Sequence, residues 1–211
     1  SEVNTKDDIS KRLVAFVLSH HECHDSSLMQ MIRGIQSYLN AKGFSLIIEY
    51  TGEDLQNERE IIERLMDDGI CGLIIFSGNP DKNIDVLEDL RNKNIPFILM
   101  DRYTRLIPVN YVGSNNFDGA YRAAEYLISL GHTRIGFIEY LPHITTENER
   151  LDGYQQAMKN NSLSVDSDLI FSYNFQNEEE LTSVILDRKI TAVMVVNDFL
   201  ATQLMDVCHR Q

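Results

Sequence analysis

One stretch of the chain, residues 110–140, restricts the possible folds more than any other. It opens with a short apolar run and closes with a run of β-formers at residues 134–138. Between these runs, apolar residues recur at the three- and four-residue spacing of a buried helix face: Phe117, Ala120, Tyr121, Ala124, Leu127 and Ile128. A strand, a helix and a strand in this order predict a parallel sheet, because a helical crossover returns the chain to the same end of the sheet.

Both ends of this helix carry signals of their own. Asn115 offers a side-chain acceptor to the first amides, and Asp118 places a carboxylate near the positive end of the helix dipole. Gly131 follows the last periodic residue, where a left-handed helix end favours a residue without Cβ. We therefore predict a helix that begins after Asn115 and ends before Gly131.

The same alternation of strands and helices runs through most of the chain. Apolar runs of strand length occupy residues 13–18, 45–50, 72–76, 96–100, 169–173 and 192–196. Helical periodicity occupies residues 28–39, 59–66, 84–90, 148–160, 178–186 and 198–209. We predict an α/β fold with two lobes, each a parallel sheet with helices on both faces.

Three segments divide the chain. Residues 1–11 are polar and are predicted to be a linker, residues 12–106 the N-terminal lobe, and residues 107–211 the C-terminal lobe. Pro108, with no periodicity around it, marks the predicted crossover. The second lobe ends before the strands that would cover its sheet edge, so we expect it to be truncated.

Composition argues against several classes of protein. No apolar run is long enough to cross a bilayer, and a net charge of -13 argues against a surface that binds nucleic acid directly. The glycine motifs of nucleotide-binding and acyl-transfer enzymes are absent, so we predict that the chain is not an enzyme. Cys71 and Cys208 are predicted to be small core residues, and the widely spaced cysteines favour a reducing, cytoplasmic compartment.

Residues 118–138 contain a sequence motif of a known protein family. The pattern D-G-A-x-x-A-x-x-Y-L-I-x-x-G-H-T-R-I-G-F-I closely resembles the lac repressor/galactose repressor family of bacterial transcription regulators. The resemblance implies a periplasmic-binding-protein-like fold that binds a small effector, a sugar, between its lobes. It also implies a homodimer that binds operator DNA through an N-terminal headpiece preceding Ser1. A periplasmic sugar-binding protein of a transport system is the alternative, and would be a secreted monomer.

Polar residues at the predicted strand ends suit a sugar ligand. In open parallel sheets, ligands bind outside the carboxyl ends of the strands. The loops there contain Asp, Asn, Arg, His and an aromatic residue, which can hydrogen-bond to vicinal hydroxyls and cover the apolar face of a sugar. The sequence therefore predicts a ligand site on these loops.

The resemblance assigns roles to five residues. Arg150, in R-L-D-G-Y, matches the arginine that clamps the effector, and Asn197, in N-D-x-x-A, matches an asparagine that faces the ligand while the next aspartate caps a helix. Phe175 aligns with a stacking aromatic residue and Asp118 with an acidic sugar contact. Arg102 belongs to the pair Asp101-Arg102, which matches an Asp-Arg pair that is frequent in the family at the end of the fourth strand.

Each of these residues also has an ordinary structural role. Arg150 could pair with Glu147 or Glu149 on the surface, Asn197 and Asp118 could cap helices, and Phe175 could pack under its loop. Arg102 could bridge to the crossover.

The loop after the first strand departs from the family pattern. We expect Ser19 and Asp25, with a histidine such as His21, to bind ligand hydroxyls. The segment His20, His21, Glu22, Cys23 and His24 consists of zinc-ligand types. Adjacent loop residues rarely converge on one ion without distant partners, and no second cluster exists. We therefore predict neither a metal nor a cofactor.

Overall fold

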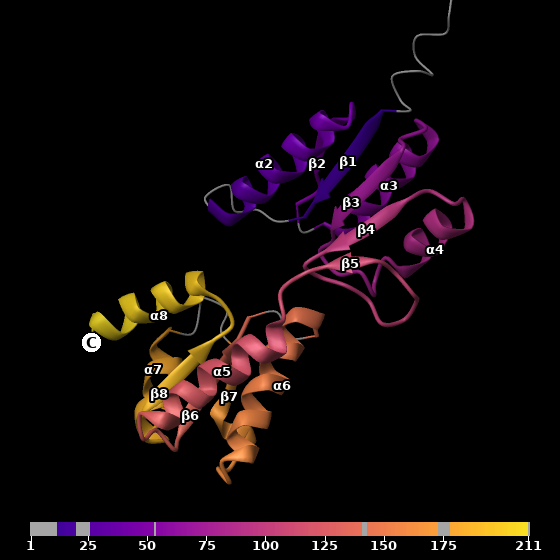
Figure 1. The fold of residues 1–211 in the computed structure, drawn as a ribbon. Helices are drawn as coiled ribbons and strands as arrows, with labels where there is room; N and C mark the ends of the chain where they lie inside the picture. The colour runs from indigo at the N-terminus through magenta and orange to yellow at the C-terminus, as the bar shows by residue number, and fades with distance from the viewer. Residues whose placement is uncertain (1–11, 20–25, 53, 141–142, 173–177, 211) are drawn as a thin grey trace, which may run out of the picture. The chain divides into compact units, whose positions relative to one another are not determined.

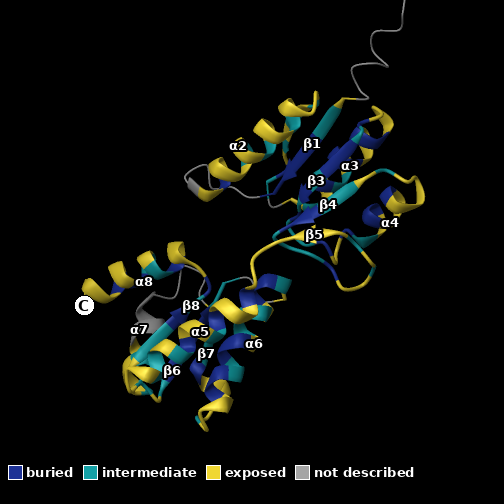
Figure 2. Ribbon diagram, viewed as in Figure 1, coloured by how far each residue is buried: buried dark blue, intermediate teal, exposed yellow. Residues whose placement is uncertain are grey.

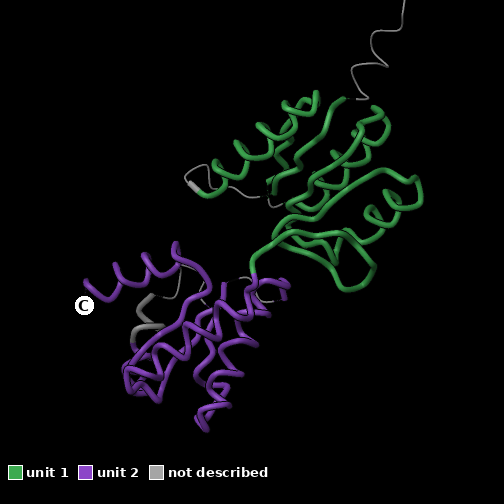
Figure 3. The backbone as a smooth tube through the Cα atoms, in the orientation of Figure 1, with its two compact units in different colours: residues 1–114 green, residues 115–211 purple. Residues whose placement is uncertain are grey.

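The computed structural model describes residues 12–19, 26–52, 54–140, 143–172 and 178–210. The chain divides into two compact units, unit 1 with residues 1–114 and unit 2 with residues 115–211 (Figure 3). Within the described residues, no helix is long and apolar enough to cross a membrane.

Unit 1 is built around a five-stranded parallel sheet with the order β2-β1-β3-β4-β5 (Figure 1). Its elements in chain order are β1 (Leu13–Leu18), α2 (Ser26–Ala41), β2 (Ser45–Tyr50), α3 (Leu55–Asp67), β3 (Gly72–Phe76), α4 (Ile84–Asn92), β4 (Phe97–Met100) and β5 (Tyr111–Val112). The four strands predicted for the first lobe are all present, and each is separated from the next by a helix.

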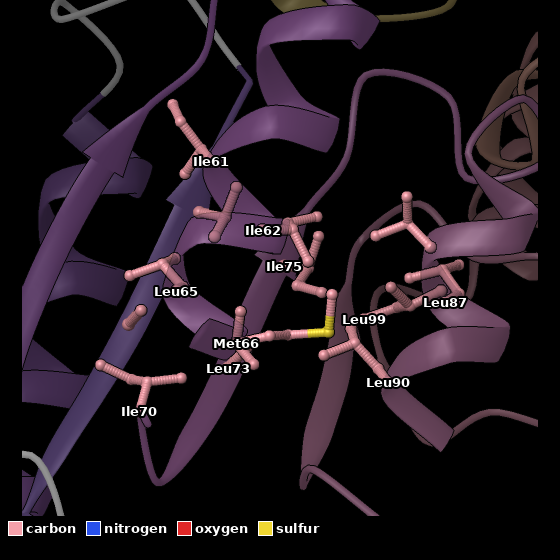
Figure 4. Close-up of a cluster of buried hydrophobic side chains, with 13 residues drawn as sticks. Ile61, Ile62, Leu65, Met66, Ile70, Leu73, Ile75, Leu87, Leu90 and Leu99 are labelled. Atoms are coloured by element: carbon pink, nitrogen blue, oxygen red, sulfur yellow. The ribbon is translucent and has the colours of Figure 1, made fainter. Parts of the chain in front are cut away.

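The core of unit 1 has two layers because alternate residues of a strand face opposite sides of the sheet. On one side, the apolar faces of α3 and α4 pack on β1, β3 and β4 (Figure 4). On the other side, Phe16 and Leu18 of β1 pack with Leu28 of α2. The central strands are accordingly buried, whereas the outer faces of the helices are exposed (Figure 2).

The short strand β5 belongs to the sheet of unit 1. Its partner is β4, with Leu99 opposite Tyr111, and the Asp101 amide donates to the Val112 carbonyl at 2.8 Å. The sequence assigned this run to the second lobe and placed the boundary between residues 106 and 107. The compact units instead divide between Ser114 and Asn115, because the chain pairs once more with the first sheet after Pro108.

Unit 2 contains a three-stranded parallel sheet with the order β7-β6-β8. Its elements are α5 (Asn116–Ser129), β6 (Ile135–Glu139), α6 (Thr145–Asn160), a 3-10 turn (Ser167–Leu169), β7 (Ile170–Ser172), α7 (Glu178–Asp187), β8 (Ala192–Val195) and α8 (Asp198–His209). The predicted strand-helix-strand unit at 110–140 is therefore shared, with its first strand in one sheet and its second in the other.

Helices α5 and α6 pack closely in the core of unit 2. Tyr154 of α6 is fully buried, its ring lies 5.3 Å from that of Phe137, and its hydroxyl donates to the Ile135 carbonyl at 2.7 Å. Burial raises the pKa of Tyr154 to about 12, so it stays neutral and remains a donor at ordinary pH. Next to it, Gly153 lies against α5 so closely that an added Cβ would be 2.3 Å from the Phe117 carbonyl oxygen.

Two details differ from the sequence-based expectations. The buried face of α5 begins at Asn116, which is 5 % exposed, whereas Phe117 is 41 % exposed and stacks on Tyr121. Cys208 of α8 is exposed rather than in the core, and Cys71 is half-buried with its thiol donating to the Leu13 carbonyl at 2.8 Å. In α8 the buried residue is the neighbouring Val207, which is 4 % exposed.

Candidate functional site

The carboxyl ends of the unit 1 strands lie at one edge of the sheet. Ser19 follows β1, Thr51 follows β2, Ser77 follows β3 and Asp101 follows β4. Backbone hydrogen bonds continue the ladder beyond the strands, since the Ser19 amide donates to the Phe76 carbonyl at 3.0 Å and the Thr51 amide to the Leu18 carbonyl at 2.9 Å. The structure thus gathers these polar residues where ligands bind in open parallel sheets.

A buried carboxylate, that of Glu58, organises this edge. Glu58 is 1 % exposed and accepts three hydrogen bonds: from the Ser77 hydroxyl at 2.6 Å, the Gly78 amide at 2.8 Å and the Asn83 side-chain amide at 3.0 Å. Asn83 also donates to the Leu55 carbonyl at 3.0 Å. One helix residue thereby fixes the loop that links β3 to α4.

Arg102 reaches the same loop from β4. Its guanidinium Nη1 donates to the Gly78 carbonyl at 2.8 Å and lies 3.4 Å from the Ser77 carbonyl, and its Cζ is 5.6 Å from the centre of the Phe76 ring. Asp101, the preceding residue, adopts a left-handed backbone with φ 62°. Left-handed non-glycine residues are uncommon and concentrate at functional sites. Arg102 therefore binds the exit of β3, a contact other than the predicted bridge to the crossover.

Ser19 has unused hydrogen-bonding capacity. Its side chain is 1 % exposed, and its hydroxyl oxygen has no hydrogen-bond partner among the described residues. The position that a Cβ of Gly78 would occupy lies 3.8 Å from both Ser19 Cβ and a Glu58 carboxylate oxygen. The unpartnered hydroxyl therefore lies beside the Glu58 network.

In unit 2, Arg150 joins three elements. It is half-buried on α6, and donates from Nε to the Asn116 side-chain oxygen at 3.1 Å and from Nη1 to the Val196 carbonyl at 2.6 Å. The Asn116 amide nitrogen in turn donates to Glu149 at 3.3 Å. Arg150 thus lies at the carboxyl end of β8, with Nη2 not used by any hydrogen bond to a described residue.

Asn197 caps helix α8 with one half of its amide group. The side-chain oxygen accepts from the Leu200 amide at 2.8 Å, which leaves the exposed nitrogen without a partner among the described residues. The resemblance assigned the cap to Asp198, and this is wrong: the cap residue is Asn197, whereas the Asp198 carboxylate accepts from the neighbouring Phe199 amide. The asparagine therefore combines a capping oxygen with an open donor.

The remaining predicted site residues lie apart or undescribed. Asp118 is exposed on the first turn of α5, where its amide donates to the Asn115 cap at 3.1 Å and its carboxylate lies 3.8 Å from Arg122. His21, Asp25 and Phe175 fall outside the described residues, as does the histidine-rich loop considered for zinc. The structure therefore groups Ser19 with Arg102, and Arg150 with Asn197.

Sequence reasoning missed two buried polar residues. Glu58 stands in the apolar stripe of α3 with Leu55 and Ile62, and Asn116 stands four residues before Ala120 on the buried face of α5. A charged or amide side chain at an apolar position of a helix must be hydrogen-bonded when buried. That pattern was visible in the sequence and could have identified both residues.

Two hollows lie away from the strand exits in unit 1. An apolar groove of about 870 Å³ runs beside α2 and is lined by residues such as Ile35, Leu39, Ile74 and Phe97. A more polar hollow is lined by residues that include Glu88, Arg91 and Asn110. The first lacks the polar groups that fix a sugar, and neither contains a predicted site residue.

Comparison with known proteins identifies the family. The family model described as the periplasmic binding protein domain matches residues 16–209, which is nearly the whole chain. The chain belongs to this family. Within this periplasmic binding protein domain, the matched region contains the described site residues of both units.

Curated relatives of this periplasmic binding protein domain are transcription regulators. The HTH-type transcriptional regulator DegA of Bacillus subtilis is 30 % identical over 176 residues, which are 82 % of this chain and 52 % of DegA. The HTH-type transcriptional repressor PurR of Vibrio campbellii is 27 % identical over 180 residues, 83 % of this chain and 54 % of PurR. The chain spans about half the length of these relatives, and none of the relatives named here is an enzyme.

Solved structures of regulators share the fold. The transcription regulator CcpA of Lactococcus lactis has a TM-score of 0.82 at 20 % identity, covering 94 % of this chain and 72 % of that one. A LacI-family regulatory protein of Chloroflexus aggregans gives 0.81 at 22 %, covering 95 % and 73 %. The regulator Cra of Pseudomonas putida, in complex with fructose 1-phosphate, gives 0.80 at 18 %, covering 95 % and 74 %. The predicted fold and the resemblance to the lac repressor/galactose repressor regulators are confirmed.

Proposed function

We propose that the chain is the effector-binding part of a bacterial transcription repressor and that its effector is a sugar. The relatives are transcription regulators, and Cra, which shares the fold, binds fructose 1-phosphate. Operator DNA would be bound by a separate headpiece, because this chain carries a net charge of -13 and DNA-binding surfaces are basic. The acidic domain would then remain clear of the phosphate backbone, in a cytoplasmic protein.

The donors at the end of β8 carry this proposal. Arg150 and Asn197 are linked through Val196, whose carbonyl accepts from Arg150 at 2.6 Å. Each retains donors, at Arg150 Nη2 and Asn197 Nδ2, that no described residue uses. A fixed guanidinium and an amide can together bind neighbouring oxygen atoms of a sugar. At the strand exits of unit 1, Ser19 offers a hydroxyl without a partner among the described residues, and Arg102 places its guanidinium at the same edge.

Regulation would follow from linkage. A sugar and operator DNA that prefer different states of the same protein change each other's affinity by equal factors. The alternative function for this fold is that of a periplasmic sugar-binding protein of a transport system. The regulator reading is favoured because the relatives and the solved neighbours named above are regulators.

A thermal-shift screen tests the ligand class. The protein would be heated with each of D-ribose, D-fructose, D-glucose, fructose 1-phosphate and cellobiose. We expect one of them to raise the melting temperature, because a ligand at 100 times its Kd stabilises the folded state by about 2.7 kcal/mol. Absence of stabilisation by every sugar, with a shift produced by zinc or a nucleobase instead, would contradict the sugar assignment.

We further propose that the chain forms a homodimer through α2 and β2. Exposed apolar side chains gather on these two elements, which pack against each other at one edge of the sheet: Met29, Met31, Tyr38, Ile48 and Tyr50. Ile48 and Tyr50 share the face of β2 that bears Leu46, the face covered by α2. Apolar patches of this kind mark protein interfaces. A second copy is the expected partner because regulators of this kind read paired operator half-sites.

Sedimentation equilibrium tests the dimer. Tyr38→Glu is expected to raise the dimer dissociation constant by about 30-fold, since a buried charge in an interface costs about 2 kcal/mol or more. Leu186→Glu is the matched control, because Leu186 is 69 % exposed and belongs to α7 of unit 2, not to α2 or β2. A wild-type protein that sediments as a monomer, or equal effects of the two variants, would rule out this interface.

A further inference from the structure

The peptide between Ser77 and Gly78 lies between two charged side chains. On one side its N–H donates to the Glu58 carboxylate at 2.8 Å, and on the other its carbonyl lies 3.4 Å from Arg102 Nη1. The next carbonyl, that of Gly78, accepts from the same nitrogen at 2.8 Å. Because a trans peptide points its N–H and C=O in opposite directions, fixing one side fixes the direction of the other.

The Glu58 carboxylate has no direct cationic partner among the described residues. Its three hydrogen bonds come from a hydroxyl, a backbone amide and a side-chain amide, all of them neutral. Burying a charged carboxylate in an apolar stripe costs free energy unless it is paired or fully hydrogen-bonded. Arg102 contacts the same peptide, since its Nη1 lies 3.4 Å from the Ser77 carbonyl oxygen while the Gly78 N–H donates to Glu58.

We propose that Glu58 is a positioning residue: it holds the Ser77–Gly78 peptide so that the carbonyls of Ser77 and Gly78 orient the Arg102 guanidinium at the strand-exit edge of unit 1. This inference deepens the proposed function, because it gives Arg102 a fixed orientation for contact with a sugar. The peptide also lies next to the Ser19 hydroxyl, which has no hydrogen-bond partner in the part of the chain that the structure describes.

Glu58→Gln tests the arrangement without any sugar. A glutamine has the same shape but no charge, so the Gly78 amide loses its charged acceptor in either orientation of the side chain. The glutamine NH2 group would also face a donor, either the Gly78 N–H or the Asn83 NH2 group, although the Ser77 hydroxyl could turn to accept from it. We expect the Gly78 amide to exchange with solvent about tenfold faster, as for the loss of one charge-assisted hydrogen bond. We also expect the Arg102 Nε–H to show increased motion in nitrogen-15 relaxation, and phenylglyoxal to modify Arg102 faster.

Matched variants separate positioning from general loosening. Glu63→Gln changes a half-exposed glutamate on the same helix that lies 3.9 Å from Arg59, and should leave Gly78 and Arg102 unchanged. Ser77→Ala removes one donor but keeps the Gly78 bond, so Arg102 should stay ordered. If Glu58→Gln does not fold, Glu58→Asp retains the charge on a stem one methylene shorter and should release Gly78 in the same way.

The outcome distinguishes this inference from the proposed function. An Arg102 signal that is unchanged in a folded Glu58→Gln or Glu58→Asp protein overturns the positioning role, whatever the sugar screen gives. Increased motion of Arg102 in the glutamate variants alone supports the role, even if the effector proves to be another small molecule. Equal loosening in Ser77→Ala would make Glu58 a general structural residue and also overturn the proposal.

Discussion

Gly153→Ala is expected to disrupt unit 2. A Cβ at this position would lie 2.3 Å from the Phe117 carbonyl oxygen and 3.0 Å from the Tyr121 amide nitrogen, both of them backbone atoms of α5. A backbone atom cannot rotate away as a side chain can, so α5 and α6 must separate. Overpacking of this kind costs about 3 kcal/mol. That exceeds the gain of about 1 kcal/mol that alanine brings over glycine in a helix.

Gly119→Ala provides the matched control. Gly119 also lies within a helix of unit 2, and no heavy atom lies within 4 Å of the position that its Cβ would occupy on α5. The only expected effect is the higher helix propensity of alanine compared with glycine, so this variant should be more stable than the wild type by about 1 kcal/mol. Urea denaturation of the full chain would measure both. A Gly153→Ala protein as stable as Gly119→Ala would show that the two helices are not locked together.

Arg150→Ala is expected to weaken effector binding strongly. The substitution removes the hydrogen bonds to Asn116 and Val196 and the Nη2 donors, which no described residue uses. Truncating one partner of a buried charged contact costs about 2 to 5 kcal/mol, so the dissociation constant for the stabilising sugar should rise by roughly 30-fold or more. Isothermal titration calorimetry with that sugar would measure the change.

Two controls make the Arg150 result specific. Arg122→Ala removes an arginine that is 78 % exposed on α5 and should bind the sugar as the wild type does. Arg150→Lys keeps the positive charge but lacks the planar guanidinium with its paired N–H donors. It should therefore recover little affinity for the sugar if the guanidinium binds two sugar oxygens at once. Unchanged affinity in Arg150→Ala would remove this residue from the site, and a loss shared by Arg122→Ala would indicate a general charge effect.

Most of the fold could be predicted because its elements carry local signals. The runs at Leu13–Leu18, Ser45–Tyr50 and Gly72–Phe76 were placed with the bounds that the structure gives them. A strand was predicted at the start of residues 110–140, but the sheet to which β5 belongs could not be predicted, because only its pairing with Leu99 and Met100 decides this. The boundary between the compact units therefore came from tertiary contacts rather than from composition.

The candidate site was less predictable than the fold. The motifs around Arg150 and Asn197 marked residues that the structure joins through Val196. Glu58 was passed over, because a charged residue in a helix is usually solvent-exposed and its three donors come from segments 19 to 25 residues away in the chain. The hydrogen-bond partners of Glu58 can be identified only from the three-dimensional structure, in which the strand ends lie at one edge of the sheet.

The side-chain oxygen of Asn197 caps α8, but helix capping does not require an asparagine at this position. Aspartate, serine, threonine and asparagine serve almost equally well as the first residue of a helix, and Asp54 does so at the start of α3 with its carboxylate oxygen. The stability of the fold therefore depends little on which of these residues stands at position 197. It gives no reason to prefer the side-chain nitrogen of asparagine over the second oxygen of aspartate. Asparagine alone among these side chains satisfies α8 and still presents an NH2 group beside Arg150. We therefore attribute the asparagine at this position to the proposed ligand binding, because helix capping alone would accept aspartate, serine or threonine equally well.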